Sequence, residues 1–240
     1  MKNSTGRMPK TIGIIGGMGP EATLDLFAKI IKLTPAKKDQ DHIHIIIDNY
    51  PQIPDRTNFI LFGDKNPKEY ILSSAKLLEN AGAGVLIMAC NTAHFFERDL
   101  RNEIKIPFIS IVDAAINELK ELNPCAKNIA VLSTTGTKAA KIYDKALIEN
   151  GYNVLDIPND LEKKIMSAIY DGVKKGKACD FADSFQKIIN EISDALKPDA
   201  FIEACTEIPI LMNSIVSKIT AVDANYALAR AAVKFAEGRD

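Results

Sequence analysis

The chain has 240 residues, of which 47% are hydrophobic and 25% are charged, a composition typical of globular proteins that bury a core. Its 30 basic and 31 acidic residues give a formal charge of −1, which excludes a strong field that attracts nucleic acids or anionic membranes. We therefore expect a small molecule as the partner. The polar opening "MKNSTGRMPK" and the short apolar run after it fit neither a signal peptide nor a membrane-spanning helix, so we expect a cytoplasmic protein.

Residues 11–31 predict a strand, a glycine turn and a helix. The apolar run "TIGII" leads into "GGMG", and Pro20 suits the first turn of the helix that follows. Leu24, Phe27 and Ile30 then recur at helical spacing. The turn lacks the G-x-G-x-x-G spacing of a dinucleotide site, but it is compatible with an anion-binding turn at a helix N-terminus.

The next segment, residues 42–49, reads "HIHIIIDN" and predicts a second strand. The two prolines of "YPQIPDRTNFI" exclude a regular element, which predicts a loop at the carboxyl end of that strand. Arg56 in this loop is either a ligand-binding cation, at the edge where open α/β sheets bind ligands, or a solvated loop charge. Residues 68–81 then predict an amphipathic helix whose inward side chains are Ile71, Leu72, Ala75 and Leu78.

Residues 85–96, "VLIMACNTAHFF", predict a buried strand that ends at Cys90. The sulfur would lie near the free N–H groups of the following helix, whose partial positive charge stabilises a thiolate. Cys90 and His94 are one helical turn apart and form half of a zinc site, but further ligands are missing, so we prefer His94 as a capping or supporting residue. The four cysteines contain no C-x-x-C pair and predict free thiols in a reducing compartment.

After a further strand and helix around residues 106–119, the second half begins like the first. "NIAVL" predicts a strand, and "STTGT" predicts a small-residue turn before a helix. Residues 161–176 predict another helix, near whose end Lys174 either complements the helix dipole or binds a ligand. A last helix, residues 221–236, is expected to pack back on the first domain.

Residues 200–211, "AFIEACTEIPIL", repeat the design of the Cys90 strand: an apolar run, then Ala-Cys, then Thr. Each half therefore opens with strand, turn and helix and closes with a strand ending in Ala-Cys, which indicates an internal duplication. The expected fold is α/β, with two similar parallel-sheet α/β/α domains related by a pseudo-twofold and the active site in the cleft between them. We assign residues 1–112 and 213–240 to the first domain and residues 113–212 to the second.

The two equivalent cysteines point to a reaction at one carbon. A lone cysteine after an apolar run is usually a packed small hydrophobe, so the catalytic hypothesis rests on there being two cysteines at equivalent positions. Inversion at a carbon needs a base on each face, one to remove a proton and one to deliver it. A hydrolase or thiol protease needs one nucleophile beside one base and has no use for a second cysteine.

Four motifs, "IGIIGGMGPEAT", "PDRT", "ACNTAHFF" and "CTEIPIL", resemble in their order and spacing the cofactor-independent aspartate/glutamate racemase family, and specifically its aspartate racemase branch. The resemblance covers nearly the whole chain. It implies two α/β domains, with Cys90 and Cys205 as the two acid/base residues that interconvert L- and D-aspartate. It also implies no pyridoxal phosphate, no metal, and a homodimer.

The resemblance further implies substrate-binding roles. Asn91, Thr92 and Thr206 match groups that hold the α-carboxylate and amine of the substrate. Arg56 matches the basic residue that receives the side-chain carboxylate, and Lys174 in "VKKG" matches a second cation. Three more residues are expected to close the same pocket: Met18, Thr134 and Thr137.

Ala204 departs from the pattern, because the family usually has Gly before its second cysteine, and this leaves turnover and substrate range open. Alternatives within the superfamily are a glutamate racemase, a broad-specificity amino-acid racemase, a hydantoin racemase, and a maleate isomerase or decarboxylase. Arg56 together with Lys174 favours a short acidic side chain. An alternative of another class is a non-catalytic two-domain module, which would bind L-aspartate without exchanging its α-proton.

Overall fold

The computed structural model describes residues 9–239. In the first half, three continuous apolar runs form strands, as expected for a parallel sheet whose two faces are both covered by helices. The elements of this half are β1 (Ile12–Gly16), α1 (Pro20–Leu33), β2 (Ile45–Asn49), α2 (Arg56–Phe62), α3 (Lys68–Asn80), β3 (Val85–Met88), α4 (Glu97–Glu103) and α5 (Ile111–Leu122).

The second half repeats this alternation and ends in one additional strand and helix. Its elements are β4 (Asn128–Ser133), α6 (Thr135–Ala139), α7 (Asp144–Glu149), β5 (Asn153–Leu155), α8 (Asn159–Ser167), α9 (Ala182–Leu196), β6 (Ala200–Ala204), α10 (Ile208–Met212), β7 (Thr220–Asp223) and α11 (Ala224–Glu237). Every helix among the described residues is too short or too polar to span a bilayer.

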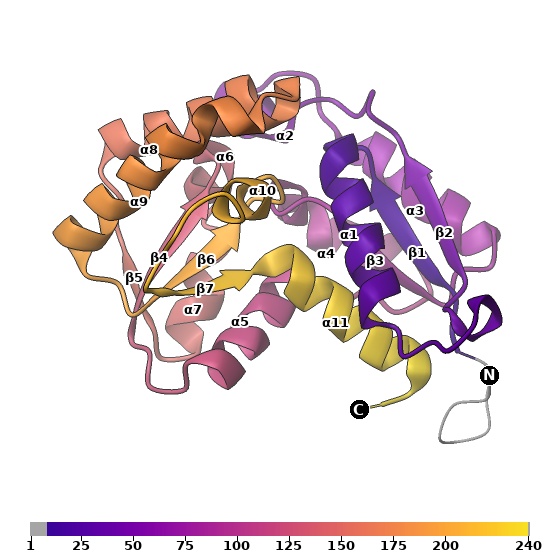
Figure 1. Cartoon of the computed structure of the whole chain (residues 1–240). Coiled ribbons are helices and arrows are strands. Elements are labelled where there is room, and N and C mark those ends of the chain that lie inside the picture. The colour runs from indigo at the N-terminus through magenta and orange to yellow at the C-terminus, as the bar shows by residue number, and fades with distance from the viewer. Residues whose placement is uncertain (1–8, 240) are drawn as a thin grey trace.

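The two halves form two parallel sheets with the same strand order. The first sheet runs β2-β1-β3 and the second runs β5-β4-β6-β7. The opening strand of each half, β1 or β4, therefore lies between the two strands that follow it, and the cysteine-bearing turn follows the equivalent strand, β3 or β6. Figure 1 shows the first sheet, with α1 and α3, on the right and the second sheet, with α8 and α9, on the left. This arrangement confirms the predicted fold of two parallel-sheet α/β domains.

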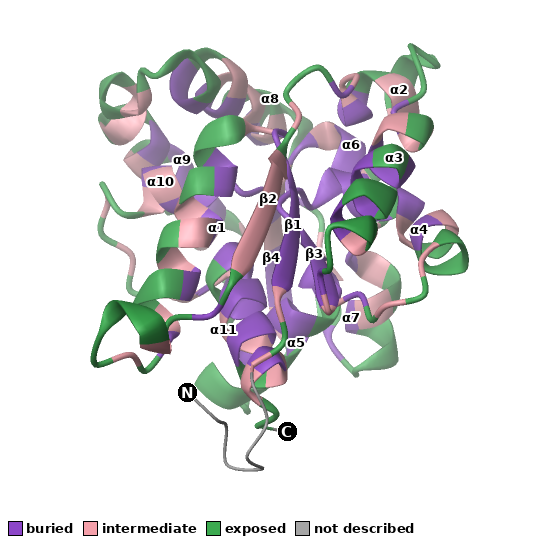
Figure 2. Ribbon diagram, turned by 90° about the vertical axis from the view of Figure 1, so that its right-hand side faces the viewer, coloured by how far each residue is buried: buried purple, intermediate pink, exposed green. Residues whose placement is uncertain are grey.

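The two sheets share one hydrophobic core. Ile14 and Ile87 of the first sheet belong to the same buried cluster as Ile129 and Ile202 of the second, and residues of α5 and α11 complete it. Fully burying such a side chain contributes roughly 1.5–3 kcal/mol relative to leaving it exposed. Figure 2 shows β1 and β3 buried, whereas β2 at the sheet edge is only partly covered. The shared core fixes the two cysteine-bearing sheet ends relative to each other.

Three expectations about local structure need correction. Arg56 does not lie in a loop: it begins helix α2, because the Asp55 carboxylate caps that helix by accepting the N–H of Asn58 at 2.8 Å. Residues 106–109 form no regular strand and contribute only the bridge between Leu86 and Phe108. On α1, Leu24 points to solvent and is 66% exposed.

The chain after residue 212 also differs from the expectation. Residues 220–223 form strand β7 instead of the start of the last helix, and β7 extends the second sheet by pairing with β6. This strand therefore belongs with the second domain, although the sequence analysis placed it in the first. Helix α11 packs against α1 and α5, and Figure 1 shows it crossing from β7 toward β3.

Candidate active site

Each cysteine turn lies at the carboxyl end of its sheet, next to the turn that follows β1 in the first sheet or β4 in the second. In each sheet the chain leaves the central strand to one side and returns on the other, which opens a crevice where open α/β folds bind ligands. The glycine turn after β1 forms one wall. Gly17 has φ of +86°, and a Cβ there would lie 2.4 Å from the Tyr50 backbone, so this position requires glycine.

A single cavity holds both sulfurs. Its volume is about 10 Å³, which is about what one water molecule needs. Cys90 is 5% exposed and Cys205 is 6% exposed, so both thiols are nearly closed off from solvent. The residues that line the cavity are Met18, Asp55, Arg56, Thr57, Cys90, Asn91, Thr92, Thr134, Tyr170, Lys174, Cys205, Thr206 and Glu207.

Arg56 is a buried cation and not a solvated loop charge. It is 7% exposed, and its two terminal nitrogens donate to the carbonyl oxygens of Met18, at 2.9 Å, and of Ile53 and Pro54, at 3.3 and 3.1 Å. Its Nε has no hydrogen-bond partner among residues 9–239. Burial lowers the pKa of Arg56, but the nearby Cys90 sulfur and Asp55 carboxylate, which can carry negative charge, raise it above its ordinary value.

Asn91 supplies a second free donor. It is 2% exposed, and its Oδ1 accepts the hydroxyl proton of Tyr143 at 2.5 Å. Within the described part of the chain, its Nδ2 makes no hydrogen bond. A buried N–H group without a partner costs free energy unless a ligand or water satisfies it. The cavity wall therefore presents unsatisfied donors, which suit an anionic ligand.

Four threonine hydroxyls connect the two halves beside the cysteines. Thr92 contacts Thr134 at 3.0 Å and Thr137 at 2.8 Å, and the Thr57 hydroxyl donates to Thr134 at 3.4 Å. Thr134 also caps α6 by accepting the N–H of Thr137 at 3.2 Å. A Cβ at Gly136 would lie 2.8 Å from the Thr57 Cα, so glycine permits this close approach of the two halves. Thr137 thus lies behind the cavity wall and supports Thr92 and Thr134.

A carboxylate lies next to the second cysteine. The Cys205 thiol donates to Oε2 of Glu207 at 3.0 Å, and the Thr206 hydroxyl donates to the same oxygen at 3.2 Å. Burial and the Glu207 carboxylate raise the pKa of the Cys205 thiol well above its ordinary value, and Lys174 acts weakly in the opposite direction.

An irregular helical segment brings two more side chains to the cavity. Helix α8 continues into a π-helical turn over Ala168–Gly172 and a 3₁₀ turn over Val173–Lys175. The Tyr170 hydroxyl donates to Oδ2 of Asp55 at 2.9 Å, across the two halves, and the Lys174 Nζ lies 4.3 Å from the Tyr170 ring centre. Burial opposes the charge of Asp55, but its hydrogen bonds and the Arg56 charge lower its pKa.

The chain is similar to known proteins over nearly its whole length. The family model described as Asp/Glu/Hydantoin racemase matches residues 15–232. The chain belongs to this racemase family. A broad-specificity amino-acid racemase of Bacillus subtilis is 30% identical over 92% of this chain and 96% of that protein. The structure of an aspartate racemase from Picrophilus torridus is 33% identical, with a TM-score of 0.83 over 95% of this chain and 94% of that one. An aspartate racemase homologue from Pyrococcus horikoshii is 26% identical, with a TM-score of 0.75 over 95% and 99%.

In this racemase, His94 supports the first cysteine turn and is not placed to bind a metal. The backbone N–H of Ile111 donates to Nε2 at 3.1 Å, so Nδ1 carries the proton and donates to the Cys90 carbonyl oxygen at 2.8 Å. Burial lowers the pKa of His94, which keeps the ring neutral. Residues 9–239 contain no group of three or more His, Cys, Asp and Glu side chains that could hold a metal ion.

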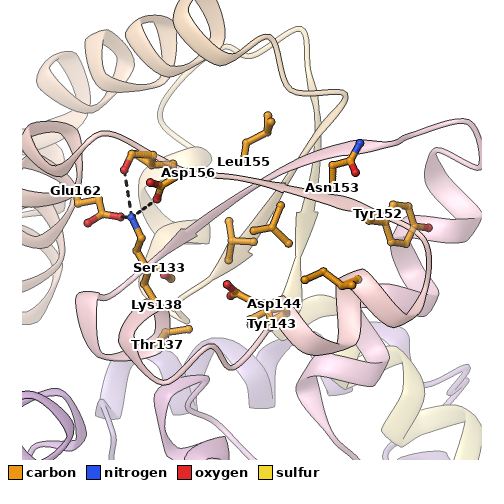
Figure 3. Close-up of a pocket in the computed structure, with 14 residues that line it drawn as sticks. Ser133, Thr137, Lys138, Tyr143, Asp144, Tyr152, Asn153, Leu155, Asp156 and Glu162 are labelled. Atoms are coloured by element: carbon orange, nitrogen blue, oxygen red, sulfur yellow. Dashed lines mark hydrogen bonds and ion pairs between the residues drawn. The ribbon is translucent and has the colours of Figure 1, made fainter.

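Besides a hollow of about 480 Å³ beside His94 and Asp113, two other hollows larger than the cavity lie outside it. One, of about 430 Å³, shares five residues with the cavity wall and offers a route to it: Met18, Asp55, Arg56, Lys174 and Glu207. The other, of about 480 Å³, lies over β4, β5 and α7. Figure 3 shows there the Lys138 amine between Asp156 and Glu162. Among the described residues, no cysteine lines this hollow, and Ser133, Thr137 and Tyr143 connect it to the candidate site.

The structure places nine of the ten residues predicted for the site at the cavity wall, with Thr137 one layer behind. Sequence reasoning missed Asp55, Thr57, Tyr170 and Glu207. Glu207 had a signal, because a carboxylate two residues after a cysteine in a buried turn must affect that cysteine. Tyr170 had none, because its approach to Asp55 depends on how the two halves pack.

Proposed function

We propose that this racemase interconverts L- and D-aspartate by a two-base proton transfer between Cys90 and Cys205. The observation that carries the proposal is the single cavity that holds both sulfurs together with unsatisfied N–H donors. One sulfur, as a thiolate, removes the α-proton from one face of the substrate. The other, as a thiol, gives its proton to the opposite face, which inverts the carbon.

The polar groups of the cavity support this assignment of roles. When the α-proton leaves, negative charge develops on the α-carboxylate oxygens, and a fixed donor such as the Asn91 Nδ2 stabilises it. A thiol has a reference pKa of about 8.5, and the α-proton of the substrate is far less acidic, so the reaction depends on this stabilisation. A site closed to water strengthens each of these interactions.

Two cations support an acidic substrate. Three of the five guanidinium N–H groups of Arg56 donate to backbone carbonyls, which leaves the Nε N–H and one N–H of Nη2 for a ligand. Lys174 is exposed, and its amine lies beside the Tyr170 ring. Together they neutralise a side-chain carboxylate. The cavity holds only about one water. The substrate therefore enters after the wall moves where the cavity adjoins the hollow of about 430 Å³, called the outer hollow below.

A broader substrate range is the second candidate. Similarity to the broad-specificity racemase of Bacillus subtilis supports it, as does the exposure of Lys174, which can turn away from a longer or uncharged side chain. Rates with aspartate, glutamate and a neutral amino acid distinguish the two. Aspartate should have the highest kcat/KM, and equal values for all three would support the broad-specificity alternative.

The decisive experiment incubates the protein with L-aspartate in deuterated water without added cofactor. We expect the optical rotation to decay to zero while the α-proton signal disappears from the NMR spectrum. Binding of L-aspartate without exchange of its α-proton would support the non-catalytic module instead. A parallel reaction with L-glutamate measures the preference for the shorter side chain.

A further inference from the structure

The turn after β6 contains a carboxyl group that the two-base reaction does not by itself require. Glu207 is 3% exposed, and one of its oxygens accepts both the Cys205 thiol and the Thr206 hydroxyl. A Cβ placed on Gly19 would lie 3.3 Å from its other oxygen, Oε1, so that oxygen faces the glycine turn. Glu207 therefore spans the space between the second sulfur and the first half of the molecule.

The short contact limits how many protons the pair can lose. A thiolate and a carboxylate 3.0 Å apart would repel each other strongly, because two like charges this close are poorly screened in a buried site. The pair therefore keeps one proton at neutral pH. The hydrogen bond that the Cys205 thiol donates to the carboxylate places that proton on the sulfur.

The charged groups around Cys205 do not cancel the effect of the Glu207 carboxylate on this thiol. Lys174, from the irregular segment after α8, is a cation that acts on this thiol, but it is exposed to solvent. The Tyr143 hydroxyl, just before α7, is buried and neutral and donates to Asn91. On the opposite side of the cavity, Arg56 lies near Cys90. One sulfur thus faces a buried cation and the other a buried carboxylate.

We propose that Glu207 is a positioning residue that holds Cys205 in the thiol form at rest, so that Cys205 begins the cycle as the acid and Cys90 as the base. This inference rests on the proposed racemase function and specifies which of the two cysteines carries a proton in the free enzyme. It assigns to the two equivalent cysteines different roles before any substrate binds.

Glu207 also provides a way to restore this state. When Cys205 gives its proton to the substrate carbon, a thiolate remains beside the carboxylate, and their repulsion favours taking up a new proton. Glu207 lines both the closed cavity and the outer hollow. A water molecule in the hollow gives a proton to the carboxylate, which passes it to the Cys205 sulfur, and the proton that Cys90 removed returns to the remaining hydroxide to re-form water. The thiol and carboxylate are then regenerated without any other reactant.

The test measures the ionisation of each thiol without substrate. The full chain is treated with short pulses of iodoacetamide over a range of pH, and the alkylation of each cysteine is read by mass spectrometry of its peptide. Cys125 and Cys179 are exposed and serve as internal references. In the wild type, half-maximal alkylation of Cys205 is expected at a higher pH than that of both references.

The variant Glu207→Gln removes the charge with little change of shape. Its Cys205 midpoint is expected to fall by about one pH unit or more, with both reference midpoints unchanged. Glu207→Asp retains the charge and should stay closer to the wild type. Glu203→Gln is the matched control, because Glu203 is also buried, at 4% exposed, and lies two residues before Cys205 on β6. It should leave the Cys205 midpoint unchanged.

An unchanged Cys205 midpoint in Glu207→Gln would overturn the proposal, as would an equal shift in Glu203→Gln. If iodoacetamide reaches Cys205 too slowly, the ultraviolet absorbance of thiolates in a background lacking Cys125 and Cys179 gives the same midpoints. In activity, the alkaline limb of the kcat/KM profile should move to lower pH in Glu207→Gln. Because the alkylation readout needs no turnover, absence of aspartate racemisation would contradict the proposed function and leave this test intact.

Discussion

The turns after β3 and β6 match in position and differ in charge. Met88-Ala89-Cys90-Asn91-Thr92 corresponds to Glu203-Ala204-Cys205-Thr206-Glu207, and the two sulfurs are 5% and 6% exposed. The first turn contains no carboxylate and lies near the Arg56 guanidinium, whereas the second contains two buried carboxyl groups. The two sulfurs thus occupy equivalent positions, and we propose that the residues that differ around them divide the roles of acid and base.

The largest expected effect comes from removing either sulfur. Cys90→Ser and Cys205→Ser should each reduce racemisation of aspartate by at least about 100-fold, because inversion needs an acid on one face and a base on the other. The measurement is the decay of optical rotation with each enantiomer. Racemisation by either variant at more than a few per cent of the wild-type rate would contradict the two-base assignment.

The same two variants should differ in isotope exchange. Cys205→Ser retains Cys90 as the base and is expected to exchange the α-proton of one enantiomer slowly with retention in deuterated water. Cys90→Ser retains a thiol that Glu207 keeps protonated, so its exchange with the other enantiomer should be slower. Comparable exchange rates in both variants would indicate that the two turns are equivalent after all.

Removing the Arg56 guanidinium, which lies near the turn after β3, should have the next largest effect. Arg56→Ala is expected to raise KM for aspartate and lower kcat, with kcat/KM reduced by about 10- to 100-fold, because a buried charged hydrogen bond is lost. Lys174→Ala should act in the same direction but more mildly, because Lys174 is exposed. Steady-state kinetics test both, and thermal unfolding controls for the carbonyl contacts of Arg56. Wild-type kinetics in both variants would leave them without a role in binding.

A smaller effect is expected from Tyr143→Phe. The Tyr143 hydroxyl orients Asn91 through Oδ1, whereas the equivalent Thr206 is held by Glu207. Losing this hydrogen bond should lower kcat/KM by about two- to tenfold. The kinetics should be compared with those of Tyr152→Phe, whose ring lines the hollow in Figure 3. Equal losses in both variants would show a general packing effect.

Glu203→Gln should change stability and leave activity nearly unchanged. Burial, with the negative charge of Asp223, raises the pKa of Glu203 to about 8. The folded state then binds one more proton than the unfolded state between the ordinary glutamate pKa and about 8, so the wild type loses stability as pH rises through this window. The slope approaches about 1.4 kcal/mol per pH unit. Urea unfolding should show the variant increasingly more stable than the wild type toward pH 8, and parallel pH profiles would contradict this assignment.

Much of the candidate site could be predicted from short sequence motifs. Cys90 and Cys205 follow short apolar runs whose length and flanking residues predict buried strands, and parallel strands bring their carboxyl ends to one edge of a sheet. Arg56 was found as a binding candidate but wrongly placed in a loop, because the prolines before it hid the capping carboxylate of Asp55. No motif predicts that backbone carbonyls hold the terminal nitrogens of Arg56.

The sequence alone determined the alternation of strands and helices, the duplication, and the two cysteines at equivalent strand ends. These features depend on periodicity and turn chemistry over a few residues, which a linear chain displays directly. Only the tertiary structure decided that β7 joins the second sheet, that Tyr170 reaches Asp55, and that one sulfur lies near Arg56 while the other contacts Glu207. Those contacts join residues brought together by the shared core, and the charge that a side chain experiences depends on such neighbours and their burial.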